Sequence, residues 1–82
     1  MGARNLTTNA FGANPLAISR GTRVTWMNSD TIAHTATSND RTTWDSGLIA
    51  PGGSFSRSFD TAGTFGYFCT LHPGMVGTVT VQ

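Results

Sequence analysis

The sequence predicts an all-β chain that folds as a small β-sandwich. Helix-forming residues are scarce, whereas Thr, Val, Phe, Gly, Asn and Ser are abundant, and this mixture favours short strands joined by turns. Turn-forming clusters such as Asn28-Ser29-Asp30, Pro51-Gly52-Gly53 and Pro73-Gly74 divide the chain at short intervals. Between such clusters we expect strands at residues 3–9, 15–20, 22–28, 33–38, 53–59, 64–69 and 75–82. Short strands at this spacing are typical of a sandwich.

Alternation within these segments indicates which face is buried. A strand with one wet face places apolar side chains at every second position. The residues predicted to face inward are Val24 and Trp26, then Phe65, Tyr67 and Cys69, and finally Val79 and Val81. In segment 53–59, Phe55, Arg57 and Phe59 share a face, so we expect Arg57 at a rim with its stem over apolar surface. Segment 39–52 is irregular, and either a short helical turn or an extended loop fits it.

The length of the chain predicts one domain, residues 1–82. A domain of this size buries a modest core, and many such domains gain stability from a disulfide, a metal or a partner. Cys69 is the only cysteine, which excludes a disulfide within the chain. A bound metal is therefore the remaining internal source of extra stability.

Charge and hydropathy exclude two classes of function. Five arginines and four aspartates give a net charge of +1, with no lysine and no glutamate. The arginines are spread singly along the chain, which argues against a nucleic-acid binder. No apolar run approaches the length of a membrane span. Because no targeting segment is recognisable, the chain is either a cytoplasmic protein or a mature or excised piece.

The segment Cys69-Thr70-Leu71-His72-Pro73-Gly74-Met75 carries the chemistry. It places a thiol, an imidazole and a thioether at intervals of three residues, directly after a predicted strand. Two imidazoles and a thiolate with a weak axial thioether form a blue-copper site. The second imidazole must come from His34, the only other histidine. We therefore predict copper ligands at His34, Cys69, His72 and Met75.

Each of these residues also has an ordinary structural interpretation. A lone cysteine is more often a small buried hydrophobe, a single histidine means little, and a methionine often fills a core. The metal site is nevertheless favoured, because the only cysteine and one of two histidines fall with a methionine in one seven-residue segment.

Several segments together support a family resemblance. They are Pro15-Leu16-Ala17-Ile18, Val24-Thr25-Trp26-Met27-Asn28-Ser29-Asp30, Ala33-His34-Thr35, Trp44-Asp45-Ser46-Gly47 and Cys69 through Val81. From Phe11 to Val81 the chain resembles the cupredoxins, in their plastocyanin, amicyanin and halocyanin branch, and its short Cys-x2-His-x2-Met loop is most similar to amicyanin. The resemblance implies a Greek-key β-sandwich of about seven to eight strands with one type 1 copper at one end.

Three positions depart from the family pattern. Thr35 stands where the family often has an asparagine that bonds to the residue after the cysteine. Here we expect Thr35 to face Thr70, with a link between the ligand loops that is either weaker or differently made. Gly74 replaces a bulky residue of amicyanin-type loops. Phe68 replaces a tyrosine that plastocyanin uses in docking, and the chain has no acidic cluster, so we expect no acidic docking surface of the plastocyanin kind.

These features predict a small blue-copper electron carrier and not an enzyme. We expect His34 to be buried and His72 to expose one ring edge, where electrons enter and leave. Redox partner proteins would dock transiently near His72 on an apolar rim. The rim residues are Leu71, Pro73, Gly74, Ile32 and Ala13, although core packing is an equal alternative for Leu71 and Ile32. We expect a monomer that works in the periplasm or elsewhere outside the cytoplasm, as cupredoxins usually do.

Three other functions remain open from the sequence. The domain could belong to a larger copper enzyme, although both histidines are already used and catalysis by this chain alone is not expected. It could deliver or store copper, but such proteins usually expose many Met or Cys residues, and this chain has three methionines and one cysteine. It could also be an interaction module that binds no metal.

Overall fold

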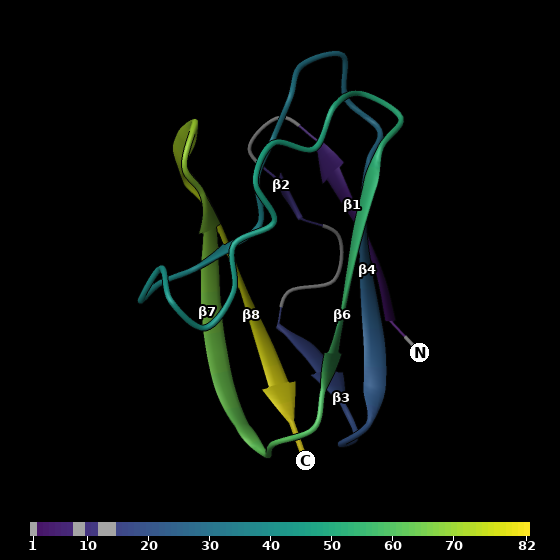
Figure 1. The fold of residues 1–82 in the computed structure, drawn as a ribbon, viewed down its shortest axis with the longest axis vertical. Helices are drawn as coiled ribbons and strands as arrows, with labels where there is room; N and C mark the ends of the chain where they lie inside the picture. Colours follow the sequence, from purple (N-terminus) through teal and green to yellow (C-terminus); the bar gives the residue numbers. More distant parts are fainter. Residues whose placement is uncertain (1, 8–9, 12–14) are drawn as a thin grey trace.

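The computed structural model describes residues 2–7, 10–11 and 15–82 and places eight strands there in two facing sheets (Figure 1). One sheet has the order β2-β1-β4-β6 and the other has the order β3-β8-β7-β5. The strands are β1 (Gly2–Thr7), β2 (Ala10–Phe11), β3 (Leu16–Ile18), β4 (Thr22–Asn28), β5 (Thr37–Ser38), β6 (Ser54–Phe59), β7 (Gly63–Cys69) and β8 (His72–Val81). The prediction of an all-β sandwich is confirmed.

The strand boundaries agree with the sequence at 22–28 and differ at 33–38. In that segment only Thr37–Ser38 forms a strand, and His34 makes an isolated bridge with Ile49. Residues 35 and 36 do not pair with a strand through their N–H groups, because the Thr35 N–H donates to the Cys69 sulfur and the Ala36 N–H donates to the Ser46 hydroxyl. Segment 39–52 is an extended, turn-rich loop. Residues 8–9 of the first predicted strand lie outside the described residues, as does Ala13.

The antiparallel pair β7 and β8 shapes the end of the sandwich where the predicted ligands lie. Its register runs from Gly63 opposite Val81 to Phe68 opposite Val76. The register then shifts, so that Cys69 lies opposite His72. As a result β8 begins at His72, three residues earlier than expected, and the chain turns within Thr70 and Leu71.

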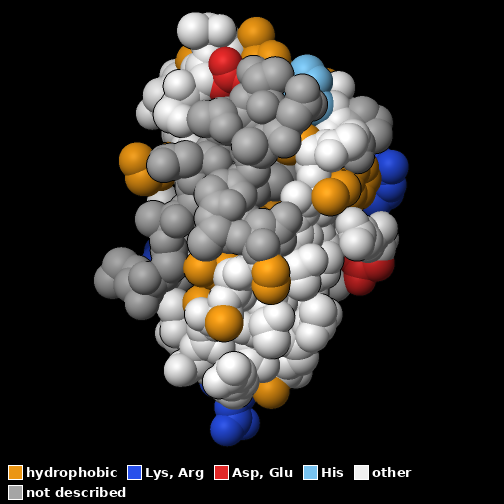
Figure 2. Space-filling model, turned by 180° about the vertical axis from the view of Figure 1, so that it is seen from behind, with side chains coloured by type: hydrophobic (Ala, Val, Ile, Leu, Met, Phe, Trp, Pro, Cys, Tyr) orange, Lys and Arg blue, Asp and Glu red, His pale blue; other side chains and the backbone are white. Residues whose placement is uncertain are grey.

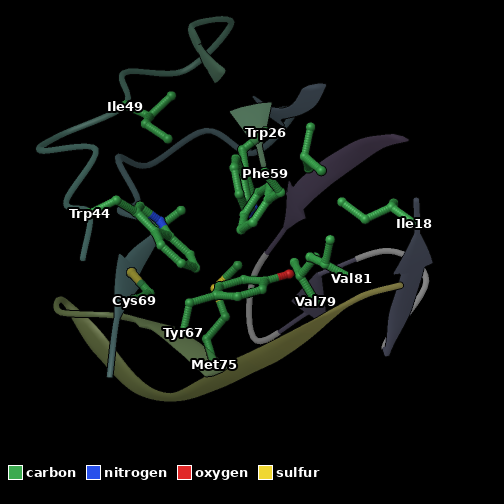
Figure 3. Close-up of a cluster of buried hydrophobic side chains, with 12 residues drawn as sticks. Ile18, Trp26, Trp44, Ile49, Phe59, Tyr67, Cys69, Met75, Val79 and Val81 are labelled. Carbon is green, nitrogen blue, oxygen red and sulfur yellow. The ribbon is translucent and has the colours of Figure 1, made fainter. Parts of the chain in front are cut away.

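The core between the sheets is an aromatic cluster around Trp26 (Figure 3). The Trp26 ring centroid lies 5.4 Å from that of Tyr67, 5.9 Å from Trp44 and 5.8 Å from Phe55. Every second residue of β4 is buried from Val24 onward, as the alternation predicted. Cys69 and Met75 belong to the same buried cluster, so the core and the predicted metal site are continuous.

Arg57 lies at the rim of this cluster, as predicted. Its guanidinium carbon is 4.8 Å from the Phe59 ring centroid and 5.1 Å from that of Trp44. A cation over an aromatic face is favourable, so the arginine can cover apolar surface at the sheet edge while its charge stays at the rim.

A glycine in β8 leaves room for the Tyr67 ring against this strand. Gly77 is opposite Tyr67, and a Cβ added there would overlap the Tyr67 ring. Tyr67 cannot retreat, because it is fully buried against Trp26 and Trp44. We expect Gly77→Ala to lower the free energy of unfolding by about 1–3 kcal/mol, the usual cost of overfilling a core.

The matched control is Gly66→Ala in β7, where the atoms nearest to the added methyl belong to the side chain of the exposed Asn39. That amide can move, so the control should be close to neutral. Urea unfolding of the metal-free protein measures both variants. Equal losses at the two glycines would contradict the packing argument.

Candidate metal centre

The fold brings three of the four predicted ligands together. The Cys69 sulfur lies 3.8 Å from His34 Nδ1, and the ring centroids of His34 and His72 are 5.1 Å apart. His34, Cys69 and Met75 are fully buried, whereas His72 is half-buried. Figure 2 shows histidine atoms at the surface near one end of the molecule. No group of three or more His, Cys, Asp or Glu side chains in the described residues has the spacing of a preassembled metal site.

The donor set nevertheless fits copper by its chemistry. A buried thiol faces a buried imidazole nitrogen, a second imidazole lies beside the first, and a thioether is buried in the same cluster. Soft sulfur combined with imidazole nitrogen favours copper over hard cations such as magnesium or calcium. The ligand set remains a prediction.

Cys69 lies in surroundings that favour its thiolate. Burial by itself raises the pKa of the thiol, but the Thr35 N–H and His34 bond to the sulfur, together with the backbone N–H groups of Leu71 and His72. These bonds outweigh burial, so the pKa of Cys69 is lowered. The Thr35 N–H donates to the sulfur at 3.3 Å. Because the thiolate is the form that binds metals, the chain itself prepares this ligand.

His34 is held from both sides of its ring. Its Nε2 lies 2.9 Å from Asp30 Oδ2, and its Nδ1 faces the Cys69 sulfur. Burial alone would lower the pKa of His34, but the bonds to Asp30 and Cys69 outweigh burial and raise it. Nδ1 is thereby directed at the position that a metal shared with Cys69 would occupy.

A threonine joins the two ligand-bearing segments. The Thr70 N–H donates to Thr35 Oγ1 at 2.9 Å, and the two threonine hydroxyls lie 3.3 Å apart. The Thr37 hydroxyl also bonds to Thr35 Oγ1, at 3.1 Å. The sequence-based expectation that Thr35 faces Thr70 is confirmed, and the link is a hydroxyl that accepts a backbone N–H.

The sequence assigned neither Asn28 nor Asp30 a role at the metal site. In the structure, the buried Asn28 amide donates to the carbonyls of Ile32 and Ile49, each at 2.8 Å. Its oxygen accepts the Asp30 N–H at 2.9 Å. These bonds hold the segment that carries His34. The spacing of Asp30 four residues before His34 is the one signal in the sequence that could have suggested the contact.

Three residues of the predicted apolar rim, Leu71, Gly74 and Ile32, are on the surface. Leu71 is 50% exposed and Ile32 is 42% exposed, which excludes the core-packing alternative for both. Val76, which the sequence did not single out, is 56% exposed. Leu71 directly precedes the half-buried His72 in the chain, and exposed apolar side chains of this size are suited to contact with another protein.

Comparison with protein families gives the decisive observation. The family described as copper binding proteins, plastocyanin/azurin family, matches residues 3–82. The chain belongs to this family. The cupredoxin resemblance seen in the sequence is therefore confirmed. Within the described residues, no helix is long and apolar enough to cross a membrane.

Individual relatives agree with this assignment. Plastocyanin of Scenedesmus fuscus is 38% identical over 88% of this chain and 86% of its own length. Amicyanin-alpha of Methylorubrum extorquens is 29% identical over 88% of this chain and 64% of its own length. A structure described as a novel purple cupredoxin from Nitrosopumilus maritimus has a TM-score of 0.94 at 27% identity, covering all of both chains. This cupredoxin is accordingly a small blue-copper electron-transfer protein with one type 1 copper.

The Thr35 link gives a testable prediction for the cupredoxin site. Thr35→Val keeps the shape of the side chain and removes the acceptor of the Thr70 N–H. We expect the free energy of unfolding of the metal-free protein to fall by about 1–3 kcal/mol, because a partly buried N–H is left without its partner. Amide exchange at Thr70 should accelerate in the same variant.

Thr35→Ser is the matched control, since it retains the hydroxyl oxygen. It should keep slow exchange at Thr70. A Thr35→Val variant with unchanged exchange at Thr70 would show that the link does not hold the two segments together.

Proposed function

We propose that His34, Cys69, His72 and Met75 hold the copper ion, and that electrons enter and leave at the His72 edge. The observation that carries the ligand set is the buried Cys69 thiol facing His34 Nδ1, with the His72 ring beside it. When bound, copper supplies one-electron chemistry between Cu(I) and Cu(II). Within this proposal Cys69 and the two imidazoles would be the strong ligands, and the Met75 thioether would be the weak one.

The chain's own contribution is a stiff set of supports. Thr35 donates its N–H to the Cys69 sulfur and accepts the Thr70 N–H, so one residue fixes both segments. Asn28 fixes the segment before His34 through bonds to two carbonyls. Ligands whose supports are themselves bonded and buried change little in position between oxidation states, and this favours fast electron exchange.

The surface around His72 supports docking of redox partner proteins. His72 is half-buried, and the exposed side chains of Leu71 and Ile32 provide apolar area. Figure 2 shows hydrophobic side chains and histidine atoms at the same end of the molecule. A small apolar patch suits a weak, short-lived contact. We propose a monomeric carrier, without enzymatic activity of its own, that works outside the cytoplasm like its plastocyanin and amicyanin relatives.

One observation weighs against a role in copper delivery. Handing copper to another protein requires that an incoming thiol or thioether reach the metal, yet both sulfur candidates, Cys69 and Met75, are fully buried. If the domain belonged to a larger copper enzyme, it would still use this site to carry electrons. Copper delivery and a role in a larger enzyme therefore both depend on the same four proposed ligands.

The ligand set is tested by two substitutions. Cys69→Ser should abolish the intense visible absorption of the copper protein, because copper does not deprotonate a hydroxyl as it does a thiol. Met75→Leu fills a similar volume and should leave the absorption in place with an altered reduction potential. Visible spectroscopy and voltammetry measure these outcomes. A Cys69→Ser variant that keeps its colour would refute the assignment.

Copper should also stabilise the fold by mass action, since the paired ligands exist only in the folded state. At a copper concentration a hundredfold above its Kd, the gain is about 2.7 kcal/mol, or a rise of roughly 10–20 °C in Tm for a domain of this size. Calorimetry with and without copper measures the shift. The Cys69→Ser variant should lose most of it, and an equal shift in that variant would place the copper elsewhere.

A further inference from the structure

Asp30 makes a contact that an ordinary turn aspartate would not make. Its Oδ2 lies 2.9 Å from Nε2 of His34, and the two side chains are 15% and 0% exposed. Asp40 and Asp45, by contrast, direct their oxygens at hydroxyls and N–H groups of their own loop or its neighbour. Asp30 differs from both of them in bonding to a proposed copper ligand.

The carboxylate of Asp30 is held in place on two further sides. Its Oδ1 accepts the Thr31 N–H at 2.7 Å. Its own N–H donates to Asn28 Oδ1 at 2.9 Å, and Asn28 is buried and bonded to two carbonyls. A carboxylate held in this way keeps its direction toward His34 without the entropy cost that weakens a surface ion pair.

This contact fixes which nitrogen of His34 carries the proton. Nε2 donates to the Asp30 oxygen, and Nδ1 is left facing the Cys69 sulfur. The hydrogen bond at one ring nitrogen commonly sets the tautomer and the orientation with which the other nitrogen binds a metal. Asp30 thus determines how His34 is presented to the site.

We propose that Asp30 is a positioning residue of the copper site that acts through His34 and lowers the reduction potential. This inference rests on the proposed ligand set. A negative charge behind the imidazole ring makes His34 a more basic ligand and favours the more positive metal state. Cu(II) carries one more positive charge than Cu(I), so the Asp30 carboxylate stabilises the oxidised protein more than the reduced one.

The expected size of the change in reduction potential follows from the usual effect of groups that bond to a metal ligand. Removing one typically weakens metal affinity by about 10- to 100-fold. If the affinity for Cu(II) falls tenfold while the affinity for Cu(I) is unchanged, the reduction potential rises by about 59 mV, the equivalent of a factor of ten for a one-electron couple. An equal loss of affinity for Cu(II) and for Cu(I) would leave the potential unchanged.

Three variants separate charge, hydrogen bond and general surface effects. Asp30→Asn keeps an acceptor oxygen for His34 and removes the charge, whereas Asp30→Ala removes both. Asp60→Asn is the matched control, because Asp60 is an exposed aspartate in the connection between β6 and β7, at the opposite end of the sandwich from the β7–β8 turn (Figure 1). All three variants lose one negative charge.

The measurements are the reduction potential of the copper protein and the nitrogen NMR spectrum of His34 in the metal-free protein. We expect the potential to rise in Asp30→Asn, to rise at least as far in Asp30→Ala, and to stay at the wild-type value in Asp60→Asn. In the metal-free wild type, the His34 proton should reside on Nε2. In Asp30→Ala, the NMR signals should show loss of that fixed tautomer. Asp30→Asn, which retains the shape of the side chain, keeps the test valid if Asp30→Ala does not fold.

Two results would overturn the inference. The first is a potential in Asp30→Asn equal to that of Asp60→Asn in proteins that remain blue. The second is a wild-type His34 with its proton on Nδ1. Failure of the ligand set is a different outcome, since the wild type itself would then lack the thiolate-to-copper absorption and the inference would fall with it.

Discussion

The burial of a thiol against an imidazole is the constraint on which the rest of the site depends. Polar groups removed from water cost several kcal/mol unless they are bonded. Cys69 and His34 are both fully buried, so each requires partners within the chain. The Thr35 N–H donates to the sulfur, and the Asp30 carboxylate bonds to Nε2 of the imidazole. These two requirements shape the chain on either side of His34, where the Asp30 side chain and the Thr35 N–H are directed at the site.

The aromatic core extends this constraint to the whole sandwich. Tyr67 and Cys69 lie two residues apart on the same face of β7, and Tyr67 packs edge-on against Trp26 with ring centroids 5.4 Å apart. The sheet that holds the sulfur is thereby fixed to the opposite sheet through Trp26 in β4. Close packing of this kind resists small displacements, so a shift of the sulfur would have to disturb the centre of the core. The rigidity that electron transfer requires is therefore a property of the fold as well as of the ligand loop.

The features that depend on local pattern could be predicted from the sequence. Alternation at Val24 and Trp26 identified the buried face of β4, and the spacing of Cys69, His72 and Met75 identified the ligand loop. His34 followed because it is the only histidine outside that loop. Of the segment 33–38 predicted as a strand, only Thr37–Ser38 forms one, because the N–H groups of Thr35 and Ala36 donate to side-chain atoms and not to the backbone of a neighbouring strand. The contact of Asp30 with His34 was missed for a related reason: a turn explains an aspartate at that position well enough without it.

The bonds that support the two buried ligand candidates exist in the metal-free chain. The pKa of Cys69 is lowered and that of His34 is raised, in each case because the bonds that the two residues receive outweigh the effect of burial. The same bonds fix the direction of both side chains, so that Nδ1 of His34 faces the Cys69 sulfur while Nε2 faces Asp30. A copper ion bound by Nδ1 and the sulfur would supply positive charge next to the thiolate, with Asp30 still at Nε2. Metal binding would then add the ion to a site whose supporting hydrogen bonds are already made.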